Sequence, residues 1–575
     1  MESIRRKINY AYEEKLIHKS GFHYLIPAII GLVFGQLAPV ISGICISASL
    51  GEVPFSALST VEPINLIFSA IGCLGGVGCG ITVSKCAGSG NREQPARIFT
   101  RAVIAMSVAT LVLSVLIAVF CDPILKFLRA TPENLPFARE YLLVLLVGTI
   151  PTVLLFAGDY IMTDDNDPGI VLLANITAAV VNVVGNFVGM EVLHFHIGAS
   201  AFALGLGEIC GCLVLSRHFK KKESLCQFVS PKRHEGDPSL LSLMKPGTPM
   251  GIMYLMFAIQ MIVQNLVLSS ESGTSGLGNS AVIDNLVLFL TIFTAAASEP
   301  VMAMASSYFG EGNRCGLLLV KRSMYHIGLA ILVPIVVVLV IFPQLFMALF
   351  SIKDPVMLGA LPFAIRIVSI NALFTFTNDS MVNFLSATER EHIANISYAI
   401  QIVINVSATL LFAKSLGEDA PWYGAMVANV CSCLFLLLVG RLFKGFVKRY
   451  PENALLLTGG HTEAAQVDEW RADTAAVLTP EQTDAVWEKV VEPFLASDDN
   501  KPEQVCSYSV IRRDNGDTAA ILRYGERMSI KQLLLGEEGG DEEAEEQSHV
   551  YGECTTSEFN TLGRRMINFK GEESC

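Results

Sequence analysis

Charged side chains are scarce in this 575-residue sequence, at 17% of all residues, whereas a soluble domain usually has about 25%. The shortage is confined to residues 21–445, where runs such as 102–121 and 327–346 contain no charged residue. A bilayer core about 30 Å thick needs about 20 apolar residues in a helix. The sequence therefore argues against a soluble enzyme and predicts an all-α membrane protein.

Motifs for metals, nucleotides and secretion are also missing. None of the 14 cysteines has a zinc-like spacing, and most lie inside apolar runs, which favours small packing residues over disulfides. A Gly-x-Gly-Asn-Arg sequence occurs twice, but without a preceding strand or a Lys-Ser/Thr pair it does not predict nucleotide binding. The first apolar run begins after Phe22 without an obvious cleavage site, so we expect a retained helix rather than a signal peptide. No cofactor and no enzymatic activity are expected.

The net charge of −13 is distributed unevenly. Residues 450–575 contain 26 acidic and 11 basic side chains, while the rest of the chain contains 28 acidic and 30 basic ones. The acidity therefore belongs to a tail that follows the apolar region. Charge gives no support to nucleic-acid binding.

The apolar runs predict twelve transmembrane helices in two six-helix bundles. The expected domains are a first bundle at 1–222, a connecting loop at 223–246, a second bundle at 247–449 and an acidic α+β tail domain at 450–575. The expected spans are 23–49, 55–84, 102–121, 137–162, 170–192 and 197–216, followed by 248–270, 280–308, 324–347, 356–386, 392–413 and 421–443.

Basic residues gather in the segments that share a side with the N-terminus. The opposite loops contain only Lys126, Arg129, Arg139, Lys353 and Lys414. By the positive-inside rule, both termini are expected in the cytoplasm of a multi-pass protein of the bacterial inner membrane, in contact with its lipid. This orientation also makes the tail domain cytoplasmic.

The two bundles are expected to be related by an internal duplication. Gly88-Ser-Gly-Asn-Arg92 recurs 222 residues later as Gly310-Glu-Gly-Asn-Arg314. At the same spacing Glu62 matches Asp284, and Asn182 matches Asn405 at a spacing of 223. Copies with an even number of spans enter the membrane from the same side, which predicts pseudo-symmetric bundles with a cleft between them.

These features resemble the multidrug and toxic compound extrusion (MATE) family over about residues 20–445. The resemblance rests on the duplicated twelve spans, the two Gly-x-Gly-Asn-Arg loops, the turn Asp164-Asp-Asn-Asp-Pro-Gly169 and the pair Asn182-x-x-x-Asn186. It implies two bundles in a V around a central cavity, and export of small organic solutes coupled to a proton or sodium ion.

Two positions depart from the family pattern. Ser42, before Gly43-Ile-Cys-Ile46, stands where related sequences have an aspartate, and Asn186 replaces the aspartate of their Asn-x-x-x-Asp motif. The usual carboxylates of the first bundle are therefore neutral here. Cation coupling, if present, is expected to use other residues.

Ionisable side chains inside spans are costly, and each is therefore a functional candidate. Asp379 has amide and hydroxyl neighbours, and Glu299 precedes a proline that frees a backbone carbonyl. These two are the candidate coupling residues. For each, a packing or water-facing role remains the alternative, including a pairing of Asp379 with Arg366.

A second set of polar residues could line a cavity. Glu62 and Asp284 lie near the outer ends of their spans, where contact with water is the alternative role. Glu208 has no evident partner, and Asp159 lies near a helix end. Ser42, Asn182 and Asn186 complete the cavity candidates, with helix-to-helix hydrogen bonding as the other interpretation.

The tail has a resemblance of its own. Residues 505–516 and 519–524 alternate like two strands around a turn, and 549–551 and 558–562 continue the pattern, with Trp470 and Trp487 in helix-like stretches. This is similar to the C-terminal half of a histidine-kinase-type ATPase fold, whose ATP-binding Asp-x-Gly reads Arg523-Tyr-Gly525 here. We expect no ATP hydrolysis, but a regulatory or docking domain with a possible cytoplasmic partner. The acidic block 537–546 is expected to be disordered.

Three functions remain open from the sequence. The first is a cation-coupled exporter of organic, cationic or amphipathic solutes that works by alternating access. The second is a flippase of lipid-linked precursors, which the scarcity of basic residues inside spans disfavours. The third is a membrane sensor that transports nothing and uses the tail as its output.

Overall fold

The computed structural model describes residues 9–89, 91, 93–128, 130, 132–221, 224–234, 236–271, 273–349, 355–442, 453–460, 464–497, 505–513, 516–525, 554–559 and 562–569. Twelve helices within these ranges are long and apolar enough to cross a membrane, as the sequence predicts. The helices of the membrane region are α1 (Ala11–Leu50), α2 (Glu52–Ser89), α3 (Glu93–Val119), α4 (Cys121–Phe127), α5 (Leu135–Asp164), α6 (Pro168–Phe187), α7 (Gly198–Leu215), α8 (Leu240–Met244), α9 (Thr248–Glu271), α10 (Gly273–Glu311), α11 (Arg314–Ile341), α12 (Pro343–Leu349), α13 (Pro355–Ala387), α14 (Glu391–Leu416) and α15 (Ala420–Leu442).

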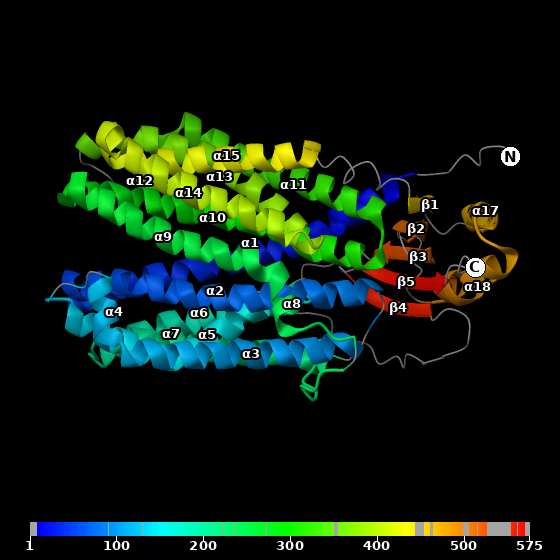
Figure 1. Ribbon diagram of the computed structural model, residues 1–575, viewed down its shortest axis with the longest axis horizontal. Coiled ribbons are helices and arrows are strands. Elements are labelled where there is room, and N and C mark those ends of the chain that lie inside the picture. Colours follow the sequence, from blue (N-terminus) through cyan, green and yellow to red (C-terminus); the bar gives the residue numbers. More distant parts are fainter. Residues whose placement is uncertain are drawn as a thin grey trace.

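The duplication is visible in the element order. The short helices α4 and α12 begin at Cys121 and Pro343, 222 residues apart, and α2 and α10 end at Ser89 and Glu311, with the same spacing. We call α1–α7 the first bundle and α9–α15 the second bundle; they lie side by side in Figure 1. The prediction of two six-helix bundles is confirmed.

The repeated Gly-x-Gly-Asn-Arg loops are helix-capping turns. Gly312 takes a positive φ of 75°, which a glycine adopts without strain, directly after α10 ends. Asn313 then caps α11 by accepting a hydrogen bond from the amide of Gly316 at 2.9 Å. Asn91 accepts from the amide of Gln94 at 3.2 Å in the first copy. The motif therefore reverses the chain between two antiparallel spans.

Several of the expected spans were placed wrongly. The span 102–121 begins nine residues late and crosses a helix break, since α3 is Glu93–Val119 and α4 begins at Cys121. The first helix begins at Ala11 rather than at residue 23, because its charged first turns pack against protein: Ile17 and Tyr24 share a core cluster with Met304 of α10. The expected span 324–347 contains a helix break, since α11 ends at Ile341 and Pro343 begins α12. Proline disfavours a helical conformation in the residue before it.

The tail forms a five-stranded antiparallel sheet with the order β1-β2-β3-β5-β4. Its strands are β1 (Ala454–Gly460), β2 (Val505–Arg512), β3 (Thr518–Gly525), β4 (Cys554–Phe559) and β5 (Leu562–Phe569), and its helices are α17 (Ala464–Ala475), α18 (Pro480–Val486) and α19 (Glu492–Leu495). The predicted pair of strands around a turn corresponds to β2 and β3. The expected strand at 549–551 and the acidic block lie outside the described residues, and the resemblance to an ATPase fold stays a prediction.

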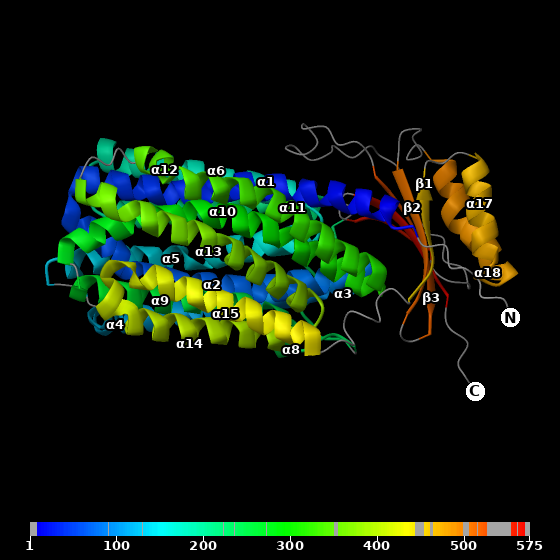
Figure 2. The same cartoon turned by 90° about the horizontal axis from the view of Figure 1, so that it is seen from above.

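The sheet stands between the membrane helices and the tail helices, as Figure 2 shows. Successive side chains of a strand point to opposite faces. One face packs Tyr508 and Tyr524 against Trp470 and Phe494 of the helical side. Residues of the other parity, Ile511, Ala519, Ile521 and Met566, form a separate cluster that is also fully buried. The sheet therefore buries both faces, and the second face is the one that meets the membrane region.

Candidate coupling site

The two bundles meet closely where α2 and α10 cross, on the side of the tail domain. A Cβ atom at Gly88 would clash with the backbone oxygen of Ser307, and one at Gly310 would clash with that of Lys85. Gly310 and Ser307 lie 222 residues after Gly88 and Lys85, so the two contacts are symmetry-related. Nearby, the hydroxyl of Ser84 donates to the carbonyl of Ala303 at 3.2 Å. The bundles are therefore in tight contact on this side, which we call the tail side.

One carboxylate of the second bundle lies within electrostatic reach of two carboxylates of the first bundle. Glu299 on α10 of the second bundle interacts electrostatically with Asp159 and Asp164 on α5 of the first bundle. We call Asp159, Asp164 and Glu299 the boundary carboxylates. Tyr160 of α5 and Tyr254 of α9 are also within electrostatic reach of Glu299. Glu299, a coupling candidate from the sequence, is thus within electrostatic reach of two carboxylates of the first bundle.

Asp164 differs from the other acidic residues of its turn. Its side chain is 1% exposed, and neither carboxylate oxygen has a hydrogen-bond partner within the described part of the chain. Asp159 accepts from the amide of Asn175 at 3.2 Å through one oxygen, while the other is buried without a partner among the described residues. A buried carboxylate without hydrogen-bond partners is costly, which adds Asp159 and Asp164 to the candidates for the site.

Asp165 and Asp167 have structural roles in the same turn. His218 lies between them, with ring nitrogens 2.7 Å from Asp165 and 2.8 Å from Asp167. Asp165 also accepts from the backbone amide of Cys226 at 3.1 Å, which ties the connection between the bundles to α5. Burial opposes ionisation of Asp167, but its bond to His218 and the charges of His218 and Lys221 outweigh burial and lower the pKa of Asp167.

Asp379 is bound within the second bundle. It accepts a hydrogen bond from the Tyr398 hydroxyl at 3.2 Å. Arg366, the alternative partner considered from the sequence, instead donates to the carbonyl of Val340 at 3.0 Å. One turn after Asp379, Asn383 donates to the backbone oxygen of Ser298 at 3.0 Å. This bond ties the helix that carries Asp379 to the residue before Glu299.

The neutral candidates of the first bundle form one buried cluster. Ser42 donates to the side-chain oxygen of Asn182 at 2.8 Å, and the amide of Asn186 donates to the Ser42 hydroxyl at 3.0 Å. Asn182 and Asn186 are 4% and 0% exposed. The structure brings these three together as a hydrogen-bonded connection between α1 and α6, which matches the packing alternative.

The remaining acidic candidates lie apart from the boundary carboxylates. Glu208 of α7 accepts a short hydrogen bond from Thr152 of α5. Glu62 shares the neighbourhood of Tyr141 with Glu208. Asp284 accepts from Gln264 at 3.0 Å in the second bundle. Their roles in transport stay predictions.

Sequence reasoning gave Asp159 little weight and treated Asp164 only as part of a motif. The signal that could have found them is their position: both lie within the last turns of α5, a long apolar helix, where a carboxylate is costly. Within the described residues, no group of three or more His, Cys, Asp or Glu side chains is arranged to hold a metal ion.

Comparison with known proteins supports the fold and the family. The MatE family model matches residues 27–188. The multidrug export protein MepA of Staphylococcus haemolyticus is 21% identical over 431 residues, which is 75% of this chain and 95% of that protein. The family model, this relative and the solved structures described next together support a MATE family transporter.

Solved MATE structures have the same architecture. A mutant of the Vibrio cholerae MATE transporter VcmN aligns with a TM-score of 0.69 at 16% identity, over 76% of this chain and 99% of that one. An outward-facing multidrug resistance MATE transporter aligns with a TM-score of 0.69 at 19% identity, over 77% of this chain and 99% of that one. These alignments leave about a quarter of this chain unmatched.

Proposed function

We propose that this MATE transporter exports organic cationic or amphipathic solutes in exchange for protons or sodium ions. The observation that carries the proposal is the set of boundary carboxylates, with Glu299 from one bundle and Asp159 and Asp164 from the other. Alternating access requires the bundles to separate along this boundary. Groups that attract or repel across it therefore respond directly to the conformational change.

Electrostatic repulsion among the carboxylates determines which conformation binds the cation more tightly. Like charges in a poorly solvated site disfavour one another, so the three carboxylates retain a proton or cation while the tail side is closed. When the bundles separate on this side, water reaches the carboxylates and the ionised forms become stable. The closed form therefore binds the cation more tightly than the open form, and only such a difference in affinity allows an ion to shift the equilibrium.

The orientation expected from the basic residues places the tail side in the cytoplasm. The closed boundary then corresponds to an outward-facing form that carries its cation. Opening to the cytoplasm releases the cation and admits the solute, and the reverse change carries the solute out. The exchange is thus driven by a cation gradient directed into the cell.

The boundary also suits flexible apolar ligands. Cys73 and Val77 of α2 pack with Met250 of α9 and Met302 of α10, and Met253 adjoins this cluster. Phe156 of α5 meets Tyr254 of α9 edge to face at 6.3 Å between ring centroids. Methionine adapts to ligands of different shape, and the relatives named above are multidrug export proteins. A range of amphipathic substrates is therefore expected.

The test is transport by the reconstituted full-length protein. Vesicles would be loaded with a panel of cationic dyes, and efflux would be followed under an imposed proton gradient, an imposed sodium gradient or neither. Gradient-dependent efflux of several dyes supports the proposal and identifies the ion. Dye binding without flux under every gradient would instead support the sensor function, which the docking of the tail domain on both bundles favours as the second candidate.

A further inference from the structure

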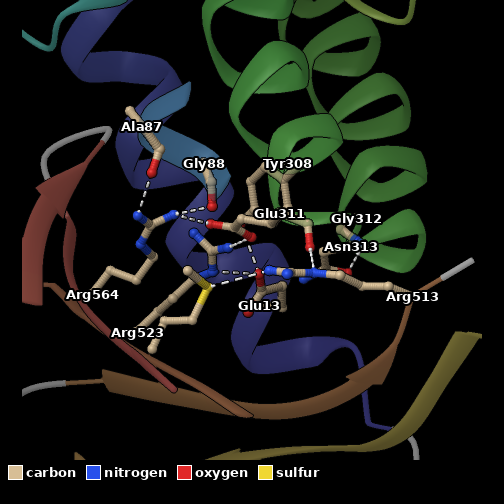
Figure 3. A network of polar contacts seen from close by, with 12 residues as sticks. Glu13, Ala87, Gly88, Tyr308, Glu311, Gly312, Asn313, Arg513, Arg523 and Arg564 are labelled. Carbon is tan, nitrogen blue, oxygen red and sulfur yellow. Dashed lines mark hydrogen bonds and ion pairs between the residues drawn. The ribbon is translucent and has the colours of Figure 1, made fainter. Parts of the chain in front are cut away.

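The tail domain contacts the membrane region through three arginines. Arg513 follows β2, Arg523 lies on β3 and Arg564 lies on β5. Figure 3 shows their guanidinium groups converging on the ends of α2 and α10 and on α1. Arg523 and Arg564 are each 1% exposed. Burial of this kind is costly for arginine unless acceptors surround it.

The acceptors come from both bundles. Arg564 donates to the backbone oxygens of Ala87 at 2.7 Å and Gly88 at 3.2 Å, which are the last carbonyls of α2 in the first bundle. The same side chain donates to Glu311 of α10 in the second bundle at 2.7 Å. One arginine therefore joins the two crossing helices at their symmetry-related ends.

Glu311 is the centre of the network. It is 0% exposed and accepts from both Arg564 and Arg523, while its backbone oxygen accepts from Arg513 at 2.8 Å. In the first copy of the repeat the equivalent residue is Ser89, which is exposed. The two loops otherwise match, but only the second loop has a charged residue at this position. The tail domain binds that charged residue.

The N-terminal end of α1 completes the network. Glu13, 1% exposed, lies 3.3 Å from Arg523 and accepts from the Tyr308 hydroxyl at 2.7 Å. The guanidinium carbon of Arg523 lies 4.2 Å from the centroid of the Tyr308 ring, a cation–π contact. Asn9 donates its backbone amide to Leu457 of β1 at 2.8 Å. The sheet is therefore anchored to α1, α2 and α10 together.

We propose that the tail domain is a latch that recognises the closed tail side and must release before the transporter opens there. Arg564 binds α2 and α10 at once, so its bonds cannot all persist when these helices separate. The latch stabilises one of two conformations through contacts that exist only in that conformation, which is the physical requirement for regulation of an equilibrium. The inference rests on the proposed alternating access, but its central measurement does not require transport.

Glu311→Ser is the decisive variant, because it gives the second loop the residue that the first loop already has. Ser89→Ala is the matched control in the first loop, and Arg471→Ala is the control on the tail, since Arg471 lies on α17 and pairs with Asp484. Arg564→Gln tests the same contact from the tail domain, in case the membrane substitution impairs insertion. All variants would be made in the full-length protein.

Amide hydrogen exchange would be measured for the segments 84–89 and 303–311, together with dye efflux. We expect Glu311→Ser and Arg564→Gln to raise exchange in both segments at least about tenfold, the factor that corresponds to about 1.4 kcal/mol, and to speed efflux. The two controls are expected to leave both readouts at the wild-type level. Faster exchange with no efflux in any variant would support the latch and remove the transport proposal instead.

Two results would overturn the latch. Unchanged exchange in both segments of the Glu311→Ser and Arg564→Gln proteins would show that the arginines do not hold the crossing closed. Faster exchange in all spans, with a lower unfolding temperature and slower efflux, would show that the tail domain supports the fold without regulating its opening.

Discussion

In each bundle a side-chain hydrogen bond joins a corresponding pair of helices, but the residues that form it differ. In the first bundle, Thr152 of α5 donates to Glu208 of α7. In the second, Asn429 of α15, 221 residues after Glu208, donates to Thr375 of α13 at 3.1 Å. The duplicated helices therefore keep their packing while the charge at matching positions differs. At Glu311 and Ser89, which also differ in charge between the copies, only the charged residue is bound by the tail domain.

Neutralising the boundary carboxylate of the second bundle is expected to uncouple efflux from the cation gradient. Glu299→Gln removes the group that meets Asp159 and Asp164, so the cation no longer distinguishes the closed from the open form. We expect gradient-driven efflux to fall by a factor in the range of about 5–150 that typical coupling energies span. Dye efflux from vesicles measures it, with Asp484→Asn on the exposed side of α18 as the control, and full activity of Glu299→Gln would remove Glu299 from the mechanism.

Asp379 is the second acidic residue of the second bundle to be tested. Asp379→Asn is expected to abolish gradient-driven efflux while the protein still inserts in the membrane. Tyr398→Phe keeps the carboxylate and removes only its 3.2 Å hydrogen bond, so a smaller loss is expected. Equal activity of Asp379→Asn and wild type in the vesicle assay would make Asp379 a packing residue.

Gly88 and Gly310 allow a test of whether the two bundles contribute equally to the contact between α2 and α10. Gly88→Ala and Gly310→Ala each place a methyl group against the backbone of the other bundle. Overpacking of this kind typically costs about 1–3 kcal/mol, and the symmetry of the two contacts predicts similar losses. Thermal unfolding of the two variants measures this, and a clearly unequal pair would contradict the symmetric crossing.

Glu208 tests whether the first bundle also contributes a coupling charge. Glu208→Gln retains an acceptor for Thr152, so we expect a change in stability within about 0.5 kcal/mol and efflux close to wild type. Vesicle efflux together with thermal unfolding decides the point. Loss of gradient-driven efflux with normal stability would show that both bundles carry a coupling carboxylate.

The smallest effect is expected at the neutral cluster. Ser42→Ala removes hydrogen bonds between α1 and α6, and such bonds in membrane proteins contribute about 0.6 kcal/mol on average, with a maximum near 1.7. We expect a loss of stability of that size in thermal unfolding and no change in the ion dependence of efflux. A changed ion dependence would return Ser42, Asn182 and Asn186 to the coupling site.

The sequence predicts much of the membrane region because the physics is local. An apolar run long enough to span a bilayer is visible in the residues themselves, and the repeated loops reveal the duplication. The start of α1 is not visible in this way: its charged first turns look soluble and become helical against the second bundle and the tail domain. Only the assembled structure supplies those partners.

The candidate site was less predictable for the same reason. Glu299 and Asp379 stand out as carboxylates within apolar runs, whereas Asp164 is distinguished from Asp165 and Asp167 only by its lack of partners in the described structure. That distinction depends on His218, which lies more than fifty residues away in the chain. The latch arginines are equally inconspicuous in the sequence, since a basic residue on a tail strand is ordinary until its acceptors on α2 and α10 are known.

The doubly buried sheet has a consequence for biosynthesis. Translation delivers all twelve spans before β5, so the membrane region is inserted while the binding surface for Arg564 is still empty. Until β5 is made, Glu311 lacks its bond to Arg564, and Ile521 of β3 lacks its β5 neighbour Met566. Each newly made molecule therefore begins unlatched, and the synthesis of β5 is what first allows the latch to close.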